Sequence, residues 1–136
     1  MKKIFAIALL FLLGSCGDED LIPEKRYIEK IVLQEGTING FDVLTGPDVK
    51  LKFFSRGDTI TSELFEDVQS LPLTFEDVDY ELTDSTFRLQ ILDEDVWDPD
   101  DILFDRTFRP YRFTENGNPF QLVYPDWIID VHWRTQ

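Results

Sequence analysis

Short runs of alternating apolar and polar residues, separated by turn residues, follow one another through most of this 136-residue chain. The last run is the clearest, because Trp127, Ile129, Val131 and Trp133 alternate with other residues. A period of two places every second side chain on one face of a strand. No window of about 11 residues shows the 3.6-residue period of an amphipathic helix. The pattern therefore predicts an all-β fold.

Eight segments carry this strand pattern, and Gly, Pro, Asn or Asp residues separate most of them. They span residues 28–34, 49–54, 59–62, 73–75, 87–92, 102–108, 120–124 and 127–133. The sixth segment has a pattern that can extend to Phe113. Ser55-Arg56-Gly57-Asp58 predicts a tight hairpin turn, and Asn116-Gly117 predicts a turn before the seventh segment. Short strands with one-sided patterning favour an antiparallel, eight-stranded β-sandwich.

The N-terminal segment has a different organisation. Lys2 and Lys3 precede an uncharged apolar run over residues 4–13, and Leu13-Gly14-Ser15-Cys16 follows. The run is too short for a bilayer, which requires roughly 20 apolar residues. Its anatomy predicts a secretory signal peptide over residues 1–15. The last four residues resemble a bacterial lipobox, which implies cleavage before Cys16 and lipid attachment to its sulfur and the new N-terminus.

Cys16 is the only cysteine of the chain, so no disulfide can form within it. We expect residues 16–26 to form a lipidated tether and residues 27–136 to form one domain. More than one acyl chain gives stable membrane anchoring. Gly17 is not the Asp that retains some lipoproteins at the inner membrane, so we expect the outer membrane, on its cell-surface or periplasmic face. Asp18-Glu19-Asp20 resembles a surface-export tag, or is simply a solvated tether.

The charge of the chain excludes some partners. The sequence has 27 acidic and 13 basic residues, with a formal net charge of −14. Such a charge disfavours nucleic acid and bare anionic lipid. Hydrophobic residues make up 43% of the chain and 12 residues are Phe, which predicts a packed core rather than disorder.

Two acid-rich segments, residues 41–48 and 93–101, lie at predicted strand ends. The candidate metal ligands within them are Asp42, Asp48, Asp93, Asp95, Asp98 and Asp101. Unpaired, clustered carboxylates would repel one another, and a hard cation removes that penalty. Calcium accepts six to eight oxygen ligands in flexible geometry. Zinc fits poorly because neither Cys nor His lies nearby, and magnesium rarely uses an all-protein carboxylate cage. The alternative is a set of solvated loops that bind no metal.

The order of several motifs resembles the C2 domain family. Asp93-Glu94-Asp95 is followed by Asp101, eight residues after Asp93, as in the third calcium loop of that family. Pro47-Asp48-Val49-Lys50-Leu51 resembles its entry into the second strand, and Leu71-Pro72-Leu73-Thr74-Phe75 resembles its Asn-Pro-x-Phe segment. The resemblance implies a C2-like sandwich with calcium held mainly by Asp93, Asp95 and Asp101.

The chain also departs from that family and from other calcium motifs. Gly46 stands where the family has a first-loop Asp before Pro, and Phe104 stands where it usually has Gly. These departures leave the stoichiometry of metal open. An EF-hand loop is excluded, because its sixth and twelfth positions would be Asp98 and Phe104 instead of Gly and Glu.

Two further features bear on function. Trp97, among the loop aspartates, can contact a membrane interface or a partner, or fold onto the sandwich. His132 is expected on the solvent side of the last strand, and no Ser or Cys nucleophile has a base, so we expect no enzyme activity.

Three functions follow as hypotheses. The first is an outer-membrane lipoprotein whose calcium-loaded end docks onto a phospholipid, a glycan or an envelope protein. The second is a metal-independent structural or interaction lipoprotein with the same sandwich. The third is a carbohydrate-binding sandwich, which would need exposed, coplanar aromatic side chains.

Overall fold

The computed structural model describes residues 24–38, 45–95 and 98–136. The predicted signal peptide, Cys16, Asp42 and Trp97 lie outside the described residues. No helix of the described part is long and apolar enough to cross a membrane.

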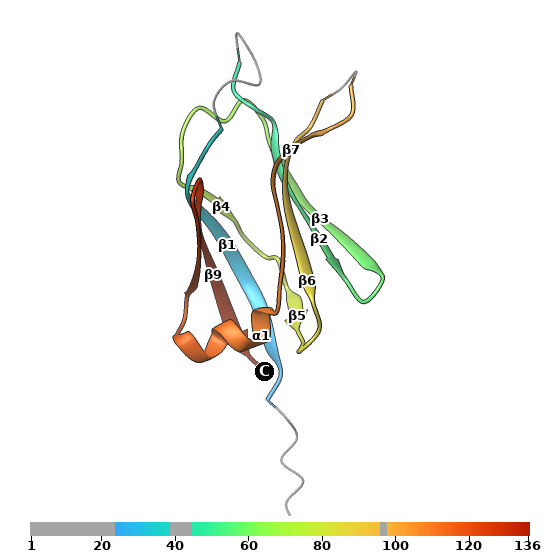
Figure 1. The fold of residues 1–136 in the computed structure, drawn as a ribbon, viewed down its shortest axis with the longest axis vertical. Coiled ribbons are helices and arrows are strands. Elements are labelled where there is room, and N and C mark those ends of the chain that lie inside the picture. Colours follow the sequence, from blue (N-terminus) through green and yellow to red (C-terminus); the bar gives the residue numbers. More distant parts are fainter. Residues whose placement is uncertain (1–23, 39–44, 96–97) are drawn as a thin grey trace, which may run out of the picture.

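Two antiparallel sheets pack face to face (Figure 1). The strands are β1 (Arg26–Gly36), β2 (Val49–Ser55), β3 (Asp58–Phe65), β4 (Leu73–Phe75), β5 (Tyr80–Leu82), β6 (Phe87–Asp93), β7 (Asp101–Phe108), β8 (Phe120–Tyr124) and β9 (Trp127–Thr135). The first sheet has the order β4-β1-β9-β8, with β5 also paired to β1. The second sheet has the order β3-β2-β6-β7. The predicted antiparallel β-sandwich is therefore confirmed.

The described residues contain nine strands, one more than the eight predicted from the sequence. The additional strand is β5. Both β4 and β5 pair with β1, since Phe75 is opposite Ile31 and Tyr80 is opposite Ile28. They form one edge strand interrupted between residues 76 and 79. Asp77 and Asp79 take left-handed backbone conformations there, with φ of 52° and 43°. Such residues break a strand pattern, which is why the alternation ends at Phe75.

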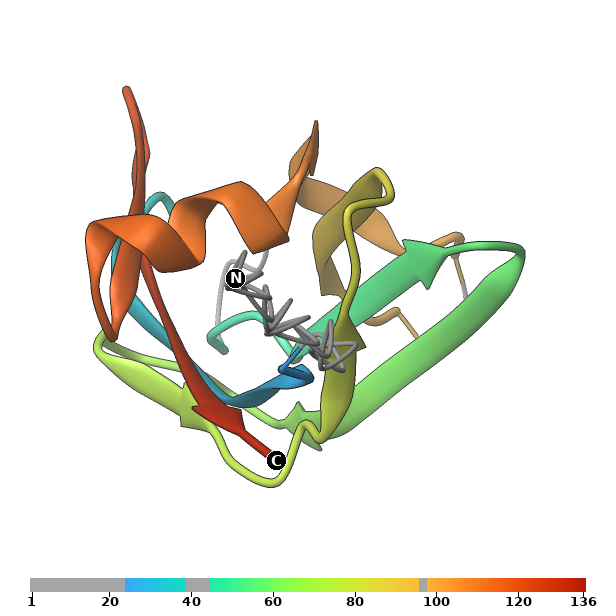
Figure 2. The ribbon, with the colours of Figure 1, turned by 90° about the horizontal axis from the view of Figure 1, so that it is seen from below.

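The predicted extension of the sixth segment to Phe113 is wrong. Pro110 begins a short helix, α1 (Pro110–Phe113), followed by the 3₁₀ turn η1 (Thr114–Asn116). Proline suits the first helical position because its missing N–H has no helical partner there. The α1–η1 segment leads from β7 of one sheet to β8 of the other and lies across one end of the sandwich (Figure 2). Phe113 packs there against Phe108 and Phe120.

The core lies between the two sheets and is rich in aromatic side chains. In β2, Val49, Leu51 and Phe53 are at most 1% exposed, and the residues between them are half-buried. Phe53 packs against Phe87 of β6, and against Tyr80 of the opposite sheet with 6.5 Å between ring centroids. Burying each large apolar side chain contributes about 1.5–3 kcal/mol. In β2 the alternation in the sequence thus encodes which face of the strand is directed inward.

Candidate functional site

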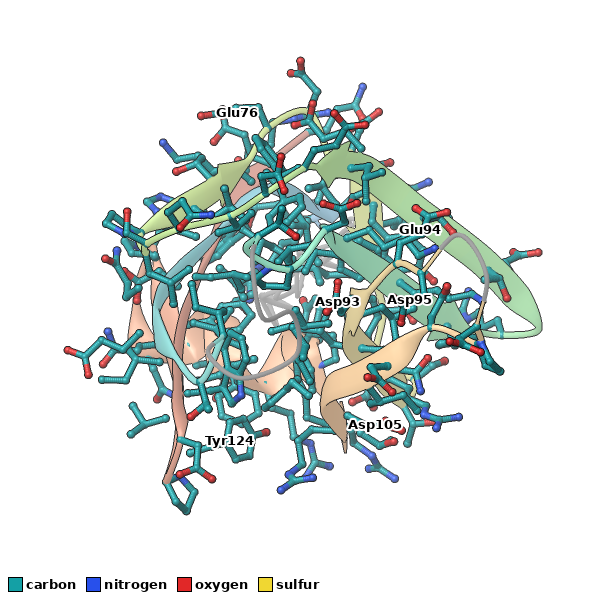
Figure 3. The ribbon with its side chains drawn as sticks, turned by 90° about the horizontal axis from the view of Figure 1, so that it is seen from above. Glu76, Asp93, Glu94, Asp95, Asp105 and Tyr124 are labelled. Atoms are coloured by element: carbon teal, nitrogen blue, oxygen red, sulfur yellow. The ribbon has the colours of Figure 1, made fainter. Side chains whose placement is uncertain are left out.

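The start of β2, the end of β6 and the start of β7 meet at one end of the second sheet. In the strand ladders, Val49 is opposite Asp93, and Asp93 is opposite Asp101. Asp48, which precedes β2, therefore lies near Asp93. Figure 3 shows Asp93, Glu94 and Asp95 together at this acidic end. We use the term acidic end for residues 48–50, 93–95 and 98–101.

Asp48 and Asp93 act as acceptors for backbone N–H groups. Asp93 is 3% exposed, and its Oδ1 accepts a hydrogen bond from the N–H of Asp48 at 2.8 Å. The Oδ1 of Asp48 accepts a hydrogen bond from the N–H of Asp67, also at 2.8 Å. The N–H of Glu94 donates to the carbonyl oxygen of Asp48 at 2.8 Å. These bonds join β2 to β6 and to the turn after β3.

Lys50 supplies a cation at the acidic end. Its Nζ lies 2.9 Å from Asp100 Oδ2 and 3.3 Å from Glu94 Oε2, and its side chain is only 13% exposed. Burial lowers the pKa of Lys50, but the hydrogen bonds and charges of Asp100 and Glu94 outweigh it, so the pKa is raised. Val49 and Leu51 face the core, so Lys50 lies on the outer face of the sheet. The ammonium group therefore stays protonated and neutralises part of the acidic charge.

The other predicted ligands within the described residues differ in their exposure to solvent. Asp98 and Asp101 are exposed, and Asp95 is half-buried. Within residues 24–38, 45–95 and 98–136, no group of three or more His, Cys, Asp or Glu side chains could hold a metal ion. The described residues therefore do not form a calcium cage. Asp100, which contacts Lys50, was not among the ligands predicted from the sequence.

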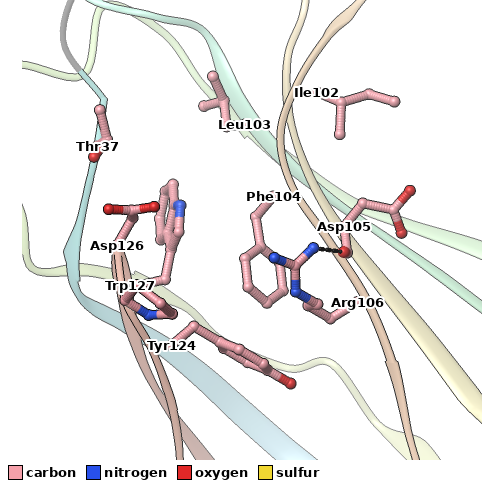
Figure 4. Close-up of a pocket in the computed structure, with 10 residues that line it drawn as sticks. Thr37, Ile102, Leu103, Phe104, Asp105, Arg106, Tyr124, Asp126 and Trp127 are labelled. Atoms are coloured by element: carbon pink, nitrogen blue, oxygen red, sulfur yellow. Dashed lines mark hydrogen bonds between the residues drawn. The ribbon is translucent and has the colours of Figure 1, made fainter.

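A second feature, which the sequence reasoning missed, is a groove of about 600 Å³ between β7 and the β8–β9 turn (Figure 4). We call it the aromatic groove. Phe104 lies at its floor, with ring centroids 5.1 Å from Tyr124 and 5.9 Å from Trp127. These rings meet at interplanar angles of 63° and 60°, so they form no coplanar platform of the kind that would favour a carbohydrate.

One guanidinium group lies over the aromatic groove. Arg106 lies 5.6 Å from the ring of Tyr124 and 5.8 Å from the ring of Phe104. Burial raises the pKa of Tyr124, while the positive charge of Arg106 opposes that shift. A cation over aromatic faces is attracted by the ring electrons, which fixes the position of this arginine.

Exposed apolar side chains flank the aromatic groove on both sheets. Ile102 of β7 is 56% exposed and Val123 of β8 is 65% exposed. Both strands are edge strands, and such edges carry backbone groups available for pairing. This side of the sandwich can therefore contact a partner through apolar, aromatic and backbone groups. The sequence signals only Val123, which alternates with the buried Phe120 and Leu122. Ile102 is two residues from the buried Phe104 and would face inward by alternation, but the β6–β7 register shifts between them.

Comparisons with known proteins support the fold alone. No protein-family profile and no curated protein sequence matches the chain. A solved structure of human GIVD cytosolic phospholipase A2 with methyl gamma-linolenyl fluorophosphonate matches with a TM-score of 0.53 and 16% identity over 82% of this chain and 17% of that chain. A structure of the same protein with this inhibitor and terbium chloride matches with a TM-score of 0.55 and 15% identity. A third structure of that protein has a TM-score of 0.51 and 13% identity.

These matches define the class of the fold, an antiparallel two-sheet sandwich of C2-like form. The chain spans about a sixth of the length of the phospholipase chains, covering 17% of two of them and 16% of the third. At such low identity the likeness extends to the architecture and not to the activity of those proteins.

Proposed function

We propose that this chain is a lipid-anchored interaction module of the bacterial outer membrane, whose C2-like sandwich binds an envelope partner without calcium. The observation that supports calcium independence is the position of Lys50 between Asp100 and Glu94, at 2.9 and 3.3 Å. The lipobox-like Leu13-Gly14-Ser15-Cys16 supports the anchor. The aromatic groove, with its exposed apolar flanks, supports binding of a partner.

Lys50 performs part of the role that a divalent ion has in an acidic loop cluster. A calcium ion would have to displace an ammonium group that two carboxylates already contact. Asp48 and Asp93 each use one oxygen for a backbone N–H. Occupied acceptors and a resident cation both reduce the gain from binding calcium.

A thermal unfolding experiment tests calcium independence. The mature lipoprotein in detergent should unfold at the same temperature in millimolar calcium and in chelator, because a ligand stabilises a protein only when it binds the folded state. Magnesium serves as the control ion. A calcium-specific rise in Tm, lost in a variant with Asp93→Asn and Asp95→Asn, would contradict the proposal.

A photocrosslinking experiment tests the interaction role. A photoreactive residue at Val123, which is 65% exposed, should yield the same crosslinked partner in calcium and in chelator. The same residue at Glu115, also exposed but in η1, serves as the control position. If neither condition gives a crosslink specific to Val123 in intact cells, the aromatic groove is not a binding surface.

Calcium-dependent docking is the second candidate function. It is favoured by the direct hydrogen bond between Asp48 and Asp93, which brings parts of the two acid-rich segments together at one end. Such a site would also require Asp42, Asp95, Asp98 or Asp101. The unfolding experiment separates the two candidates, because only this one predicts a calcium-linked rise in Tm.

A further inference from the structure

A second groove, of about 480 Å³, lies between β3 and the interruption that separates β4 from β5. Phe53, 1% exposed, and the half-buried Val78 provide apolar surface in it. Ile60 of β3 lies on its wall and is 38% exposed. Figure 3 places Glu76, another residue of this groove, at the margin of the molecule opposite Tyr124. The groove is therefore separate from the aromatic groove, and we call it the acidic groove.

Uncompensated negative charge distinguishes the acidic groove. Glu63, Glu76 and Asp77 line it, and no Lys, Arg or His does so. Within the described ranges, none of these three carboxylates forms an ion pair with a basic side chain. The basic residues that form ion pairs contact carboxylates elsewhere, and they are Lys25, Lys50, Arg88, Arg112 and Arg134. The groove thus carries a charge that a cationic partner would complement.

The carboxylates are held on structured segments. The N–H of Val78 donates to the carbonyl oxygen of Glu29 in β1 at 3.1 Å, which ties the interruption to the first sheet. Glu63 lies in β3, beside Ser62, whose hydroxyl accepts the N–H of Leu51 at 2.9 Å. The β2–β3 register shifts between Lys50 and Lys52, so Leu51 has no opposite residue in β3. The hydroxyl of Ser62 accepts its N–H there. The negative charges therefore face the groove from two anchored walls.

An unpaired strand edge runs along the same groove. β3 is the outermost strand of its sheet, and among the described strands it pairs only with β2. Residues 60–63 of β3 form one wall of the groove. An extended peptide can add to such an edge through main-chain hydrogen bonds, with alternate side chains pointing into a groove.

We propose that the acidic groove binds an extended, basic segment of a partner protein alongside β3. Alternate Lys or Arg side chains of that segment would face Glu63, Glu76 and Asp77, and their methylene stems would cover Phe53 and Val78. This inference rests on the proposed interaction role and adds the chemistry of the partner and the place where it binds.

Other occupants fit the groove less well. A metal ion is disfavoured because the described residues contain no group of three close ligating side chains, so the charges of the groove are spread out. A second copy of the chain is disfavoured because its net charge of −14 would meet the same three carboxylates. A peptide with several separated basic residues matches both the spacing of the charge and the strand edge.

The test uses the full-length lipoprotein in detergent and a fluorescent nonapeptide that alternates Lys with Val. Binding should weaken as salt screens the charges. A variant with Glu63→Gln, Glu76→Gln and Asp77→Asn should bind about tenfold more weakly, since three partly exposed ion pairs together contribute about that factor. Asn tolerates the left-handed φ of Asp77, so the fold should persist, which a thermal unfolding curve verifies.

The control variant carries Glu24→Gln, Glu35→Gln and Glu115→Gln, three exposed acidic residues that do not line the acidic groove. Both variants remove three negative charges, so they change the net charge of the protein equally. If local contacts decide binding, the peptide affinity of the control variant should remain within about twofold of that of the unmodified protein. Equal losses in both variants, or no loss in either, would overturn the inference.

A second measurement separates this inference from the proposed function. Peptide binding should slow hydrogen exchange of β3 amides, and a peptide alternating Glu with Val should not. If the Val123 crosslink forms in chelator but β3 stays unprotected, the interaction role stands and the acidic groove is refuted. If β3 is protected but the Val123 crosslink does not form, the acidic groove binds the peptide and the aromatic groove is not a binding surface.

Discussion

The buried carboxylate of Asp93 accepts a hydrogen bond from the backbone N–H of Asp48, with 2.8 Å between Oδ1 and N. The two residues are 45 positions apart in the sequence, and their contact closes β2 against β6 at the acidic end. Removing the acceptor leaves a partly buried N–H group without this partner. Asp93→Ala should therefore lower the free energy of unfolding by about 1–3 kcal/mol.

The matched variant for this first prediction is Asp93→Asn, which keeps an oxygen that can accept the N–H of Asp48. It should lose less stability than Asp93→Ala. Urea denaturation of both variants measures the difference through the midpoint at constant m-value. Equal losses would mean that the negative charge of Asp93, and not the hydrogen bond, stabilises this end.

Lys50→Met should destabilise the protein because Glu94 and Asp100 would then face each other without the ammonium group. The ion pairs are partly exposed, so the free energy of unfolding should fall by about 1–2 kcal/mol, a loss between those typical of exposed and of buried ion pairs. Lys52→Met is the control, since Lys52 lies on the same face of β2 and contacts only the ring of Phe54 among the interactions described. Urea denaturation at low salt should separate the two variants. A loss for Lys52→Met as large as that for Lys50→Met would contradict the assigned role of Lys50.

The carboxylate of Asp105 should make stability depend on pH. The Arg88 guanidinium, 2.7 Å away through Nε, lowers the pKa of Asp105, burial opposes this, and Gln90 adds a hydrogen bond at 2.9 Å. The folded pKa lies below the unfolded value of about 3.9. The contribution is therefore present above about pH 4 and lost as the pH falls through the folded pKa.

Asp105→Asn tests this dependence. The variant should be less stable than the unmodified protein at pH 7, and the gap should narrow as the pH falls below about 4. Thermal unfolding across this pH range provides the measurement. A gap of constant size at all pH values would show that Asp105 stabilises the fold by packing alone.

Arg26 should hold the α1–η1 segment onto the first sheet. Its guanidinium carbon lies 4.7 Å from the ring of Tyr111 and 5.0 Å from the ring of Trp133, and its Nη1 donates to the hydroxyl of Thr114. Arg26→Met keeps a long side chain but removes the charge, and should cost about 1 kcal/mol. Hydrogen exchange should rise in residues 110–116 more than in β6. A uniform rise across the domain would instead indicate global destabilisation.

Cys16→Ser should release the protein from the membrane, since the proposed acyl chains supply its anchorage. Labelling with a fatty-acid analogue and fractionation of cells measure the effect. A second variant, with Asp18→Asn, Glu19→Gln and Asp20→Asn, should stay lipidated. Its protease accessibility on intact cells distinguishes a surface-export tag from a plain solvated tether. Membrane association that persists without Cys16 would contradict the anchor.

The pattern of the strands could be read from local sequence because alternation reports which side of each strand faces the core. β2 illustrates this, since its buried and half-buried positions alternate without interruption. β5 could not be predicted, because it has only three residues and these are too few to show an alternation of apolar and polar side chains. It also follows Asp77 and Asp79, whose left-handed backbone conformations interrupt the edge strand. The strand predicted over residues 102–108 matches β7, but the helix at Pro110 was not predicted because the apolar pattern of that segment can extend to Phe113.

The candidate sites depended on contacts between residues distant in sequence. The acid-rich segments were apparent as composition, yet composition does not specify that Lys50 contacts Glu94 and Asp100. The acidic groove is equally absent from local patterns, because Glu63 lies in β3 of one sheet, Glu76 lies between β4 and β5 of the other, and the groove exists only between them.

The sequence by itself determined the all-β class and the inward face of most strands, since both depend on local periodicity, and its composition predicts an N-terminal targeting segment. Only the tertiary structure decided which charges meet and which stay unpaired. The physical reason is that electrostatic contacts act over a few ångströms, and the folding of the chain, not the order of its residues, sets those distances.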